Sequence, residues 1–180
     1  PYAQIASRHG IDTLDTYSLF IDSTGFVATR YFATDGLHLD TTGYRRWIDS
    51  CLLPYMNAQS PSVSSVGMLG NSITASIGDV SFGFGARGYV NNWWSTFLLR
   101  PAENLGFGGF TSYDLRLFID ELLSTPAYDE LKWYFILIGT TDIEEGVPID
   151  SIADNVEQSV TTLLGAGKQV VLQAVMPRVD

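Results

Sequence analysis

The most constraining feature of this sequence is an unbroken apolar run, Trp133 to Ile138, that ends at a glycine. Such a run is typical of a central strand of a parallel sheet, because helices cover both faces of that sheet. Further segments along the chain have strand-like patterns and are separated mostly by helical ones. The other strand-like segments are Ile11–Tyr17, Ser65–Leu69, Glu103–Leu105 and Gln169–Met176.

The segments between these strands repeat apolar residues at helical spacing. Strands that alternate with helices predict an α/β fold, here a three-layer α/β/α sandwich around a parallel sheet of about five strands. Thr41 or Thr42 is the expected cap of the second helix, and a Ser-rich stretch over 56–65 is the expected linker. The helical segments are Tyr2–Arg8, Gly43–Tyr55, Tyr89–Leu99, Tyr113–Leu123 and Ile149–Leu164.

The acidic composition restricts the class of partner. Ten basic against twenty acidic residues give a net charge of −10, so nucleic acids and anionic membrane surfaces would repel the chain. The 180 residues predict one domain, and an apolar fraction of 46% supplies a core. No apolar run approaches the ~20 residues of a membrane span. Cys51 is the only cysteine, which excludes an intrachain disulfide.

The compartment and the oligomeric state stay open at this point. The chain starts at Pro1 and has no signal-like segment, so a processed N-terminus is compatible with the sequence. A secreted or periplasmic location is favoured over the cytoplasm.

Polar residues follow the ends of three of the expected strands. Ser72 follows the strand that ends at Leu69, Thr141 follows the central strand, and Asp35 and His38 lie in a loop after the first strand. Functional groups in open α/β sheets gather beyond the carboxyl ends of the strands. We therefore expect a Ser-His-Asp site, with Ser72 as the nucleophile, His38 as its base and Asp35 orienting the imidazole.

Other interpretations of these motifs are weaker. An isolated Asp-x-x-His is more often a surface ion pair or a helix cap, and His38 has no second histidine at metal-ligand spacing. His9, the other histidine, is expected at a solvated helix end. Gly83–Gly88 matches a dinucleotide fingerprint, but the segment before it is a poor strand. We therefore expect neither a metal nor a cofactor.

Four motifs together resemble those of the SGNH (GDSL-type) hydrolases, across essentially the whole chain. The resemblance implies a flavodoxin-like sandwich and a serine esterase in which the backbone N–H groups of Ser72 and Gly109 hold the oxyanion. It also implies that Thr141 stands where the family has an oxyanion Asn, and Asn71 where many members have Asp. The matching motifs are Gly70–Thr74, Asn104–Thr111, Gly139–Asp142 and Asp35–His38 followed by Gly43-Tyr44.

The order of these motifs differs from that of the family, where the nucleophile motif comes first and the Asp-His motif last. Residues 1–55 resemble the family's C-terminal part and residues 66–180 its N-terminal part. We interpret this order as a circular permutation within a single domain, 1–180. A segment that straddles two tandem copies has the same order and stays an alternative.

The expected activity is ester hydrolysis through an acyl-enzyme. Small acyl groups such as acetyl are the expected substrates, with carbohydrate O-acetyl esters as one candidate. The alternatives are a non-catalytic carbohydrate-binding relative, an acyltransferase, and an esterase of the lysophospholipase type that acts on lipids. The expected partner is a small-molecule ester.

Overall fold

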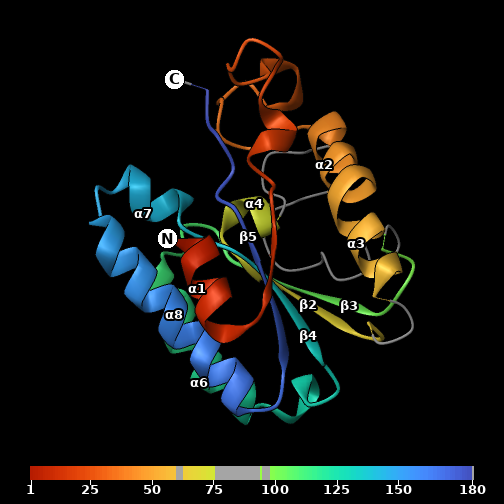
Figure 1. Ribbon diagram of the computed structural model, residues 1–180, viewed down its shortest axis with the longest axis vertical. Coiled ribbons are helices and arrows are strands. Elements are labelled where there is room, and N and C mark those ends of the chain that lie inside the picture. Colours follow the sequence, from red (N-terminus) through yellow and green to blue (C-terminus); the bar gives the residue numbers. More distant parts are fainter. Residues whose placement is uncertain (60–62, 76–93, 95–97, 180) are drawn as a thin grey trace.

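The computed structural model describes residues 1–59, 63–75, 94 and 98–179 (Figure 1). Its centre is a five-stranded sheet in the order β1-β5-β4-β2-β3, and every pairing in it is parallel. The α/β fold with a parallel sheet, expected from the sequence, is confirmed. The strands are β1 (Asp12–Leu14), β2 (Val66–Gly70), β3 (Ala102–Gly106), β4 (Trp133–Leu137) and β5 (Gln169–Gln173).

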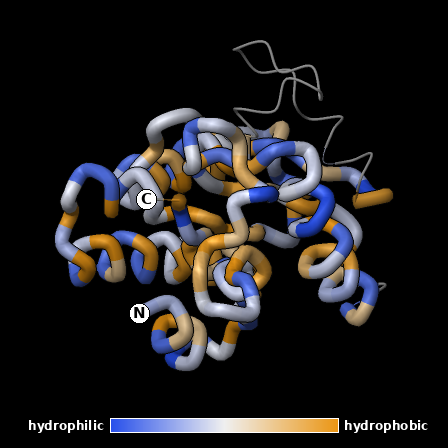
Figure 2. The backbone as a smooth tube through the Cα atoms, turned by 90° about the horizontal axis from the view of Figure 1, so that it is seen from above, coloured by the Kyte–Doolittle hydropathy of each residue, from blue (hydrophilic) through white to orange (hydrophobic). Residues whose placement is uncertain are grey.

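Helices cover both faces of the sheet (Figure 1). One face is covered by a continuous helical rod, and the other by three separate helices. Figure 2 shows hydrophobic and hydrophilic residues alternating along the helices, as burial of one helix face requires. The rod consists of α2 (Thr41–Trp47), a π-helical segment (Ile48–Leu52) and α3 (Leu53–Ala58); the opposite helices are α1 (Tyr2–His9), α6 (Ser112–Ser124) and α8 (Ile149–Gly165).

The central strand β4 supplies both layers of the core. Phe135 and Leu137 point to the α2–α3 rod, whereas Tyr134 and Ile136 point to the opposite helices. Successive residues of a strand face opposite sides, so a strand that is buried on both faces has no polar positions. This explains the unbroken apolar run from which the fold was predicted.

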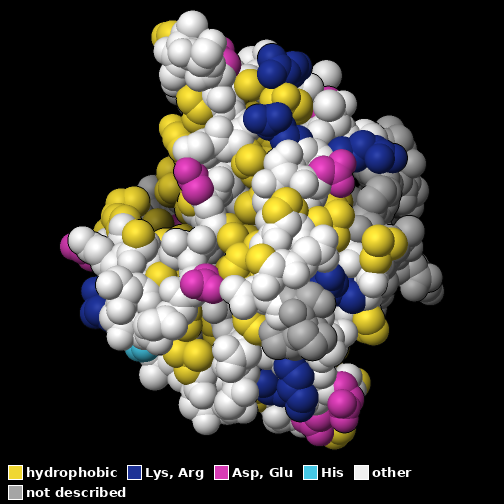
Figure 3. Space-filling model, turned by 45° about the vertical axis from the view of Figure 1, so that its right-hand side comes forward, with side chains coloured by type: hydrophobic (Ala, Val, Ile, Leu, Met, Phe, Trp, Pro, Cys, Tyr) yellow, Lys and Arg dark blue, Asp and Glu magenta, His cyan; other side chains and the backbone are white. Residues whose placement is uncertain are grey.

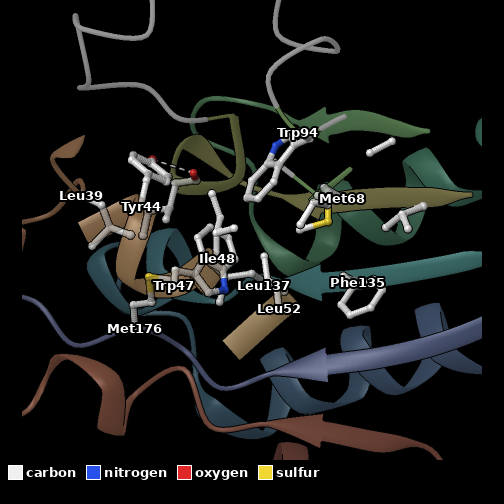
Figure 4. Packing of buried hydrophobic residues seen from close by; sticks show 14 of the residues in the cluster. Leu39, Tyr44, Trp47, Ile48, Leu52, Met68, Trp94, Phe135, Leu137 and Met176 are labelled. Carbon is white, nitrogen blue, oxygen red and sulfur yellow. Dashed lines mark hydrogen bonds between the residues drawn. The ribbon is translucent and has the colours of Figure 1, made fainter. Parts of the chain in front are cut away.

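The layer under the α2–α3 rod is rich in aromatic side chains (Figure 4). Trp47 is fully buried and meets Trp94 edge to face, with ring centroids 5.2 Å apart. Its indole N–H donates to the side-chain oxygen of Gln173 at 2.9 Å. This bond satisfies a buried donor, which would otherwise cost about 1–3 kcal/mol.

Several boundaries differ from the sequence-based expectation. Asp40, not Thr41 or Thr42, caps α2, since its carboxylate accepts from the Gly43 N–H at 2.8 Å. The rod continues to Ala58, because Met56 is fully buried in the core, and the expected linker over 56–65 therefore starts later. Strand β1 has three residues, fewer than the expected Ile11–Tyr17; it lies at the sheet edge and pairs with β5 alone.

Three shorter segments carry residues of interest at the carboxyl edge of the sheet. They are α4 (Ser72–Ala75), α7 (Thr140–Glu144) and the loop between β3 and α6. Most of the expected helix Tyr89–Leu99, and all of Gly83–Gly88, lie outside the described residues. Single-turn 3-10 segments are η1 (Ser18–Phe20), η2 (Thr29–Tyr31) and η5 (Pro126–Tyr128).

Candidate active site

The three residues expected to form a Ser-His-Asp site lie in one hydrogen-bonded chain. The Ser72 Oγ is 2.8 Å from Nε2 of His38, and Nδ1 of His38 is 2.7 Å from the Asp35 carboxylate. Ser72 and His38 are partly buried, whereas Asp35 is more exposed. Both imidazole nitrogens are thus engaged, one with a potential nucleophile and the other with an acid that fixes the tautomer.

The loop that carries Asp35 and His38 is held mostly by its own atoms. The second carboxylate oxygen of Asp35 accepts the N–H groups of Leu37 and His38, each at 2.9 Å. Gly36 adopts a φ of +69°, which allows the tight turn between Asp35 and His38. The Gly36 carbonyl accepts from the Val179 N–H at 2.8 Å, so the chain after β5 supports this turn.

The environment of Asp35 favours its charged form. Partial burial raises the pKa of this carboxyl, but hydrogen bonds from the His38 ring and from two backbone N–H groups outweigh it. The net result is a pKa of Asp35 below the ordinary value of 3.8. Asp35 therefore stays a carboxylate across the neutral range and can stabilise a protonated imidazole.

Ser72 lies at the first turn after the buried strand β2. The side chain of Asn71, which is 1% exposed, accepts the Ile73 N–H at 3.1 Å and so forms the turn. Tyr44 of α2 donates its hydroxyl to the Ile73 carbonyl at 2.8 Å. The Ser72 turn is thus fixed by both its own strand and the helix that follows the Asp35–His38 loop.

Gly109 and Thr141, the residues expected to complete an oxyanion hole, follow the two strands that flank β2. Gly106 of β3 pairs with Gly70, and the Phe107 N–H donates to the Gly70 carbonyl at 3.0 Å, so the Gly109 loop starts beside the Ser72 turn. Gly109 itself is exposed and has a φ of +79°.

Thr141 approaches the Ser72 turn from the other neighbouring strand, β4. The side-chain amide of Asn71 donates to the Thr141 hydroxyl oxygen over 3.5 Å, which is a long hydrogen bond. Because Asn71 supplies a donor, the Thr141 hydroxyl hydrogen is left to donate elsewhere. The two departures from the family motifs, Asn71 and Thr141, therefore contact each other.

Two cavities extend from this edge of the sheet. One, of about 360 Å³, is lined by Thr140, Ile143, Tyr17 and Val27, together with the segment after β5 that includes Arg178. The other, of about 310 Å³, shares Ile143 and Val175 with the first and continues to Tyr2 and Ile152. Ser72 lines neither cavity. The first cavity borders the site through Thr140, next to Thr141, and through the chain that supports Gly36.

Within the part of the chain that the structure describes, no group of three or more His, Cys, Asp or Glu is placed to hold a metal ion. Among those same residues, no helix has the length and apolarity that crossing a membrane requires. His9 is not simply solvated as expected, since its Nε2 lies 3.1 Å from a Glu157 oxygen that also binds Arg8. Figure 3 shows basic side chains among the acidic ones on one face of this net-negative protein.

Sequence reasoning assigned no function to Asp142, Ser112 and Asn155, which form a polar cluster beside the site; Asp142 and Ser112 are buried and Asn155 is partly buried. Asp142 accepts hydrogen bonds from Ser112, and Ser112 accepts one from Asn155. Asp142 is the last residue of the Gly139–Asp142 motif, and this position was the one sequence feature that pointed to it. Its partners lie on distant segments without a motif of their own.

The family model of the GDSL-like lipase/acylhydrolases matches residues 68–180, which is more than half of the sequence. The chain belongs to this family. The match includes the Ser72, Gly109 and Thr141 segments, whereas Asp35 and His38 lie before it. No curated protein matches the chain.

The chain is similar in part to solved structures of two esterases and a lipase. The psychrotrophic esterase EstA of Pseudoalteromonas, inhibited by monoethylphosphonate, is 19% identical, with a TM-score of 0.50 over 63% of this chain and 61% of its own. The SGNH-hydrolase family esterase AlinE4 is 20% identical, with a TM-score of 0.46 over 63% and 60%. A GDSL-like lipase from Bacteroides thetaiotaomicron is 18% identical, with a TM-score of 0.43 over 72% and 56%. The chain spans about three-fifths of the length of these structures.

Proposed function

We propose that this protein hydrolyses carboxylic esters through an acyl-enzyme on Ser72. The Ser72 Oγ attacks the ester carbonyl carbon while Nε2 of His38 takes the hydroxyl proton. The protonated imidazole, stabilised by the Asp35 carboxylate, then gives that proton to the departing alcohol. Water deprotonated by His38 attacks the acyl carbon, the bond to Ser72 breaks, and Oγ recovers its proton as the acid leaves.

The observation that carries this proposal is the continuous hydrogen-bonded chain from Ser72 through His38 to Asp35, at 2.8 and 2.7 Å. A serine hydroxyl is a weak nucleophile until a base within hydrogen-bond reach accepts its proton. Membership in the GDSL-like lipase/acylhydrolase family supports the same chemistry.

The oxyanion is held, in this proposal, by the N–H groups of Ser72 and Gly109 and by the Thr141 hydroxyl. Donors aimed at the developing negative charge are worth about 10²–10³ in rate each. The role of Thr141 is supported by the long hydrogen bond that its oxygen accepts from Asn71, since the Thr141 hydroxyl hydrogen is then left to donate elsewhere. In this proposal Asn71 compensates for the replacement of the family's Asn by Thr.

We propose short acyl groups such as acetyl as the substrates, with carbohydrate O-acetyl esters as one class. The cavity beside Thr140 is the compartment that would receive the acyl group, since apolar side chains such as Ile143 and Met176 line part of it. Its volume of about 360 Å³ exceeds what an acetyl group fills, so a series of acyl lengths is part of the test.

The test is the release of nitrophenol from p-nitrophenyl acetate, butyrate and octanoate by the wild type and by Ser72→Ala. Turnover that the substitution abolishes supports the proposal, and the acyl length with the highest kcat/KM defines the substrate class. Equal background rates in both proteins on all three esters would overturn it. A sugar-binding protein without catalysis would give that result.

A further inference from the structure

Asp142 is a charged side chain in the interior of the protein. It is 1% exposed and lies in the first turn of α7, directly after Thr141. Its two oxygens accept the Ser112 N–H, each at 2.9 Å, and one of them also accepts the Ser112 hydroxyl at 2.6 Å. These partners are neutral donors from the start of a different helix.

A buried carboxylate with neutral partners is expensive to maintain unless hydrogen bonds satisfy it. Ser112 is the first residue of α6, so its N–H is one of the donors that a helix start leaves unpaired within the helix. The helix dipole also favours a negative charge there. Asn155 of α8 donates to the Ser112 hydroxyl oxygen at 3.2 Å, which orients the hydroxyl hydrogen toward Asp142.

This arrangement joins the two loops that carry the proposed oxyanion donors. Thr141 immediately precedes Asp142, and Gly109 lies three residues before Ser112. The Gly109 loop is itself stiff, because Phe107 and Phe110 stack with centroids 4.5 Å apart. A reciprocal capping box between Thr111 and Asp114 fixes the start of α6. The hydrogen bonds from Ser112 to Asp142 therefore join the Gly109 loop to the segment that carries Thr141.

We propose that Asp142 is a positioning residue that holds the Gly109 N–H and the Thr141 hydroxyl at the spacing a tetrahedral oxyanion requires. It acts through these donors and does not touch the substrate. The inference rests on the proposed ester hydrolysis. Donors must lie about 2.7–3.1 Å from the oxyanion, and a misplacement of about 1 Å can lower the rate about 10²-fold.

The decisive variant is Asp142→Asn, which keeps the shape of the side chain but turns one acceptor into a donor facing Ser112. We expect kcat for p-nitrophenyl acetate to fall at least about tenfold while KM changes less than about threefold, because the donors act mainly on the transition state. Ser159→Ala is the matched control. It removes a buried serine hydrogen bond to the Asn155 backbone carbonyl within α8, and leaves the side chains of Asn155, Ser112 and Asp142 in place.

A double-mutant cycle separates positioning from general stability. If Asp142 acts through Thr141, Asp142→Asn must cost less in a Thr141→Val background than in the wild type. Losses in kcat that multiply independently would overturn the inference, as would a loss no larger than that of Ser159→Ala. Ser112→Ala, which removes one of the three hydrogen bonds, replaces Asp142→Asn if the latter does not fold, and we expect a smaller fall in kcat.

The two proposals fail in different ways. Wild-type protein without turnover that depends on Ser72 would contradict ester hydrolysis itself. Active wild type together with a folded Asp142→Asn variant of unchanged kcat would contradict only the positioning role.

Discussion

The two sides of the candidate active site are held by different kinds of contact. On the acid–base side, the Asp35 carboxylate binds the backbone of its own turn and the ring of His38, three residues further on. On the oxyanion side, Thr141 is approached by Asn71, seventy positions away in the chain, and Asp142 binds Ser112, thirty positions away. The hydrogen bonds on the acid–base side are thus local in sequence, and those on the oxyanion side are tertiary contacts.

This difference indicates which part of the site keeps its geometry when packing elsewhere in the fold is disturbed. A local turn keeps its shape as long as its own backbone hydrogen bonds form, whereas the proposed oxyanion donors, Gly109 and Thr141, depend on how β3, β4 and the helices after them pack together. Damage to the packing should therefore impair stabilisation of the transition state before it disturbs the contact between Asp35 and His38.

The largest effect is expected on the local side. His38→Ala removes the base, and we expect kcat/KM for p-nitrophenyl acetate to fall by about 10⁴-fold or more. Asp35→Asn leaves the imidazole without its charged partner, so we expect kcat/KM to fall by about 10⁴-fold. Steady-state kinetics check both values, and an Asp35→Asn variant within tenfold of the wild type would contradict the assigned role.

A smaller effect is expected on the tertiary side. Thr141→Val preserves the side-chain shape but removes the hydroxyl donor, so kcat should fall by about 10²-fold with little change in KM. Restoring the family's residue with Thr141→Asn should keep more activity than Thr141→Val does, because an amide also donates. A Thr141→Val variant as active as the wild type would show that the oxyanion is held without this residue.

Substitutions at two glycines with positive φ test how much each side of the site contributes to the free energy of unfolding. Gly36→Ala strains the turn, and the new Cβ would lie 3.0 Å from both the Cβ and the carbonyl oxygen of Val179, so we expect a loss of about 1–3 kcal/mol. The Cβ added by Gly109→Ala would have no atom within 4 Å, so we expect the free energy of unfolding to fall by about 1 kcal/mol from backbone strain alone. Urea unfolding measures both, and a larger loss at Gly109 would reverse the comparison.

The smallest effect concerns pH. Because the pKa of Asp35 is lowered in the folded protein, the stability that its contacts contribute is present above the unfolded value and is lost as the pH falls through the folded pKa, below 3.8. We expect less than about 1 kcal/mol, since this carboxylate is half exposed. An NMR titration of the Asp35 carboxyl carbon gives the pKa directly, and a midpoint above 3.8 would contradict the assignment.

The sequence was most informative where structure is periodic or local. The strand at Trp133–Leu137 and the helix α8 follow from apolar spacing, and the Asp35–His38 turn is short enough to be recognised as one motif. The contact of Asn71 with Thr141 and the bonds of Asp142 depend on strand order, which no local pattern specifies. Asp40 was missed as the cap of α2 because the two threonines after it have equally suitable side chains.

The explanation for the order of the motifs stays a proposal. We propose that the chain is a circular permutation of the family fold, in which residues before the matched segment supply the acid and the base. The pairing of β1 with β5 and the contact of His38 with Ser72 support it, since both join the two parts of the chain. Sequencing the gene beyond both ends of this segment tests it: a second nucleophile motif upstream would instead indicate tandem copies.

The central claim is that Ser72 is activated by His38, and covalent labelling tests it most directly. Intact-protein mass spectrometry after reaction with a fluorophosphonate should show one adduct on the wild type, located at Ser72 by peptide mapping. Ser72→Ala should gain none, and His38→Ala should react far more slowly. A wild type that stays unlabelled, or an adduct that persists in Ser72→Ala, would contradict the claim.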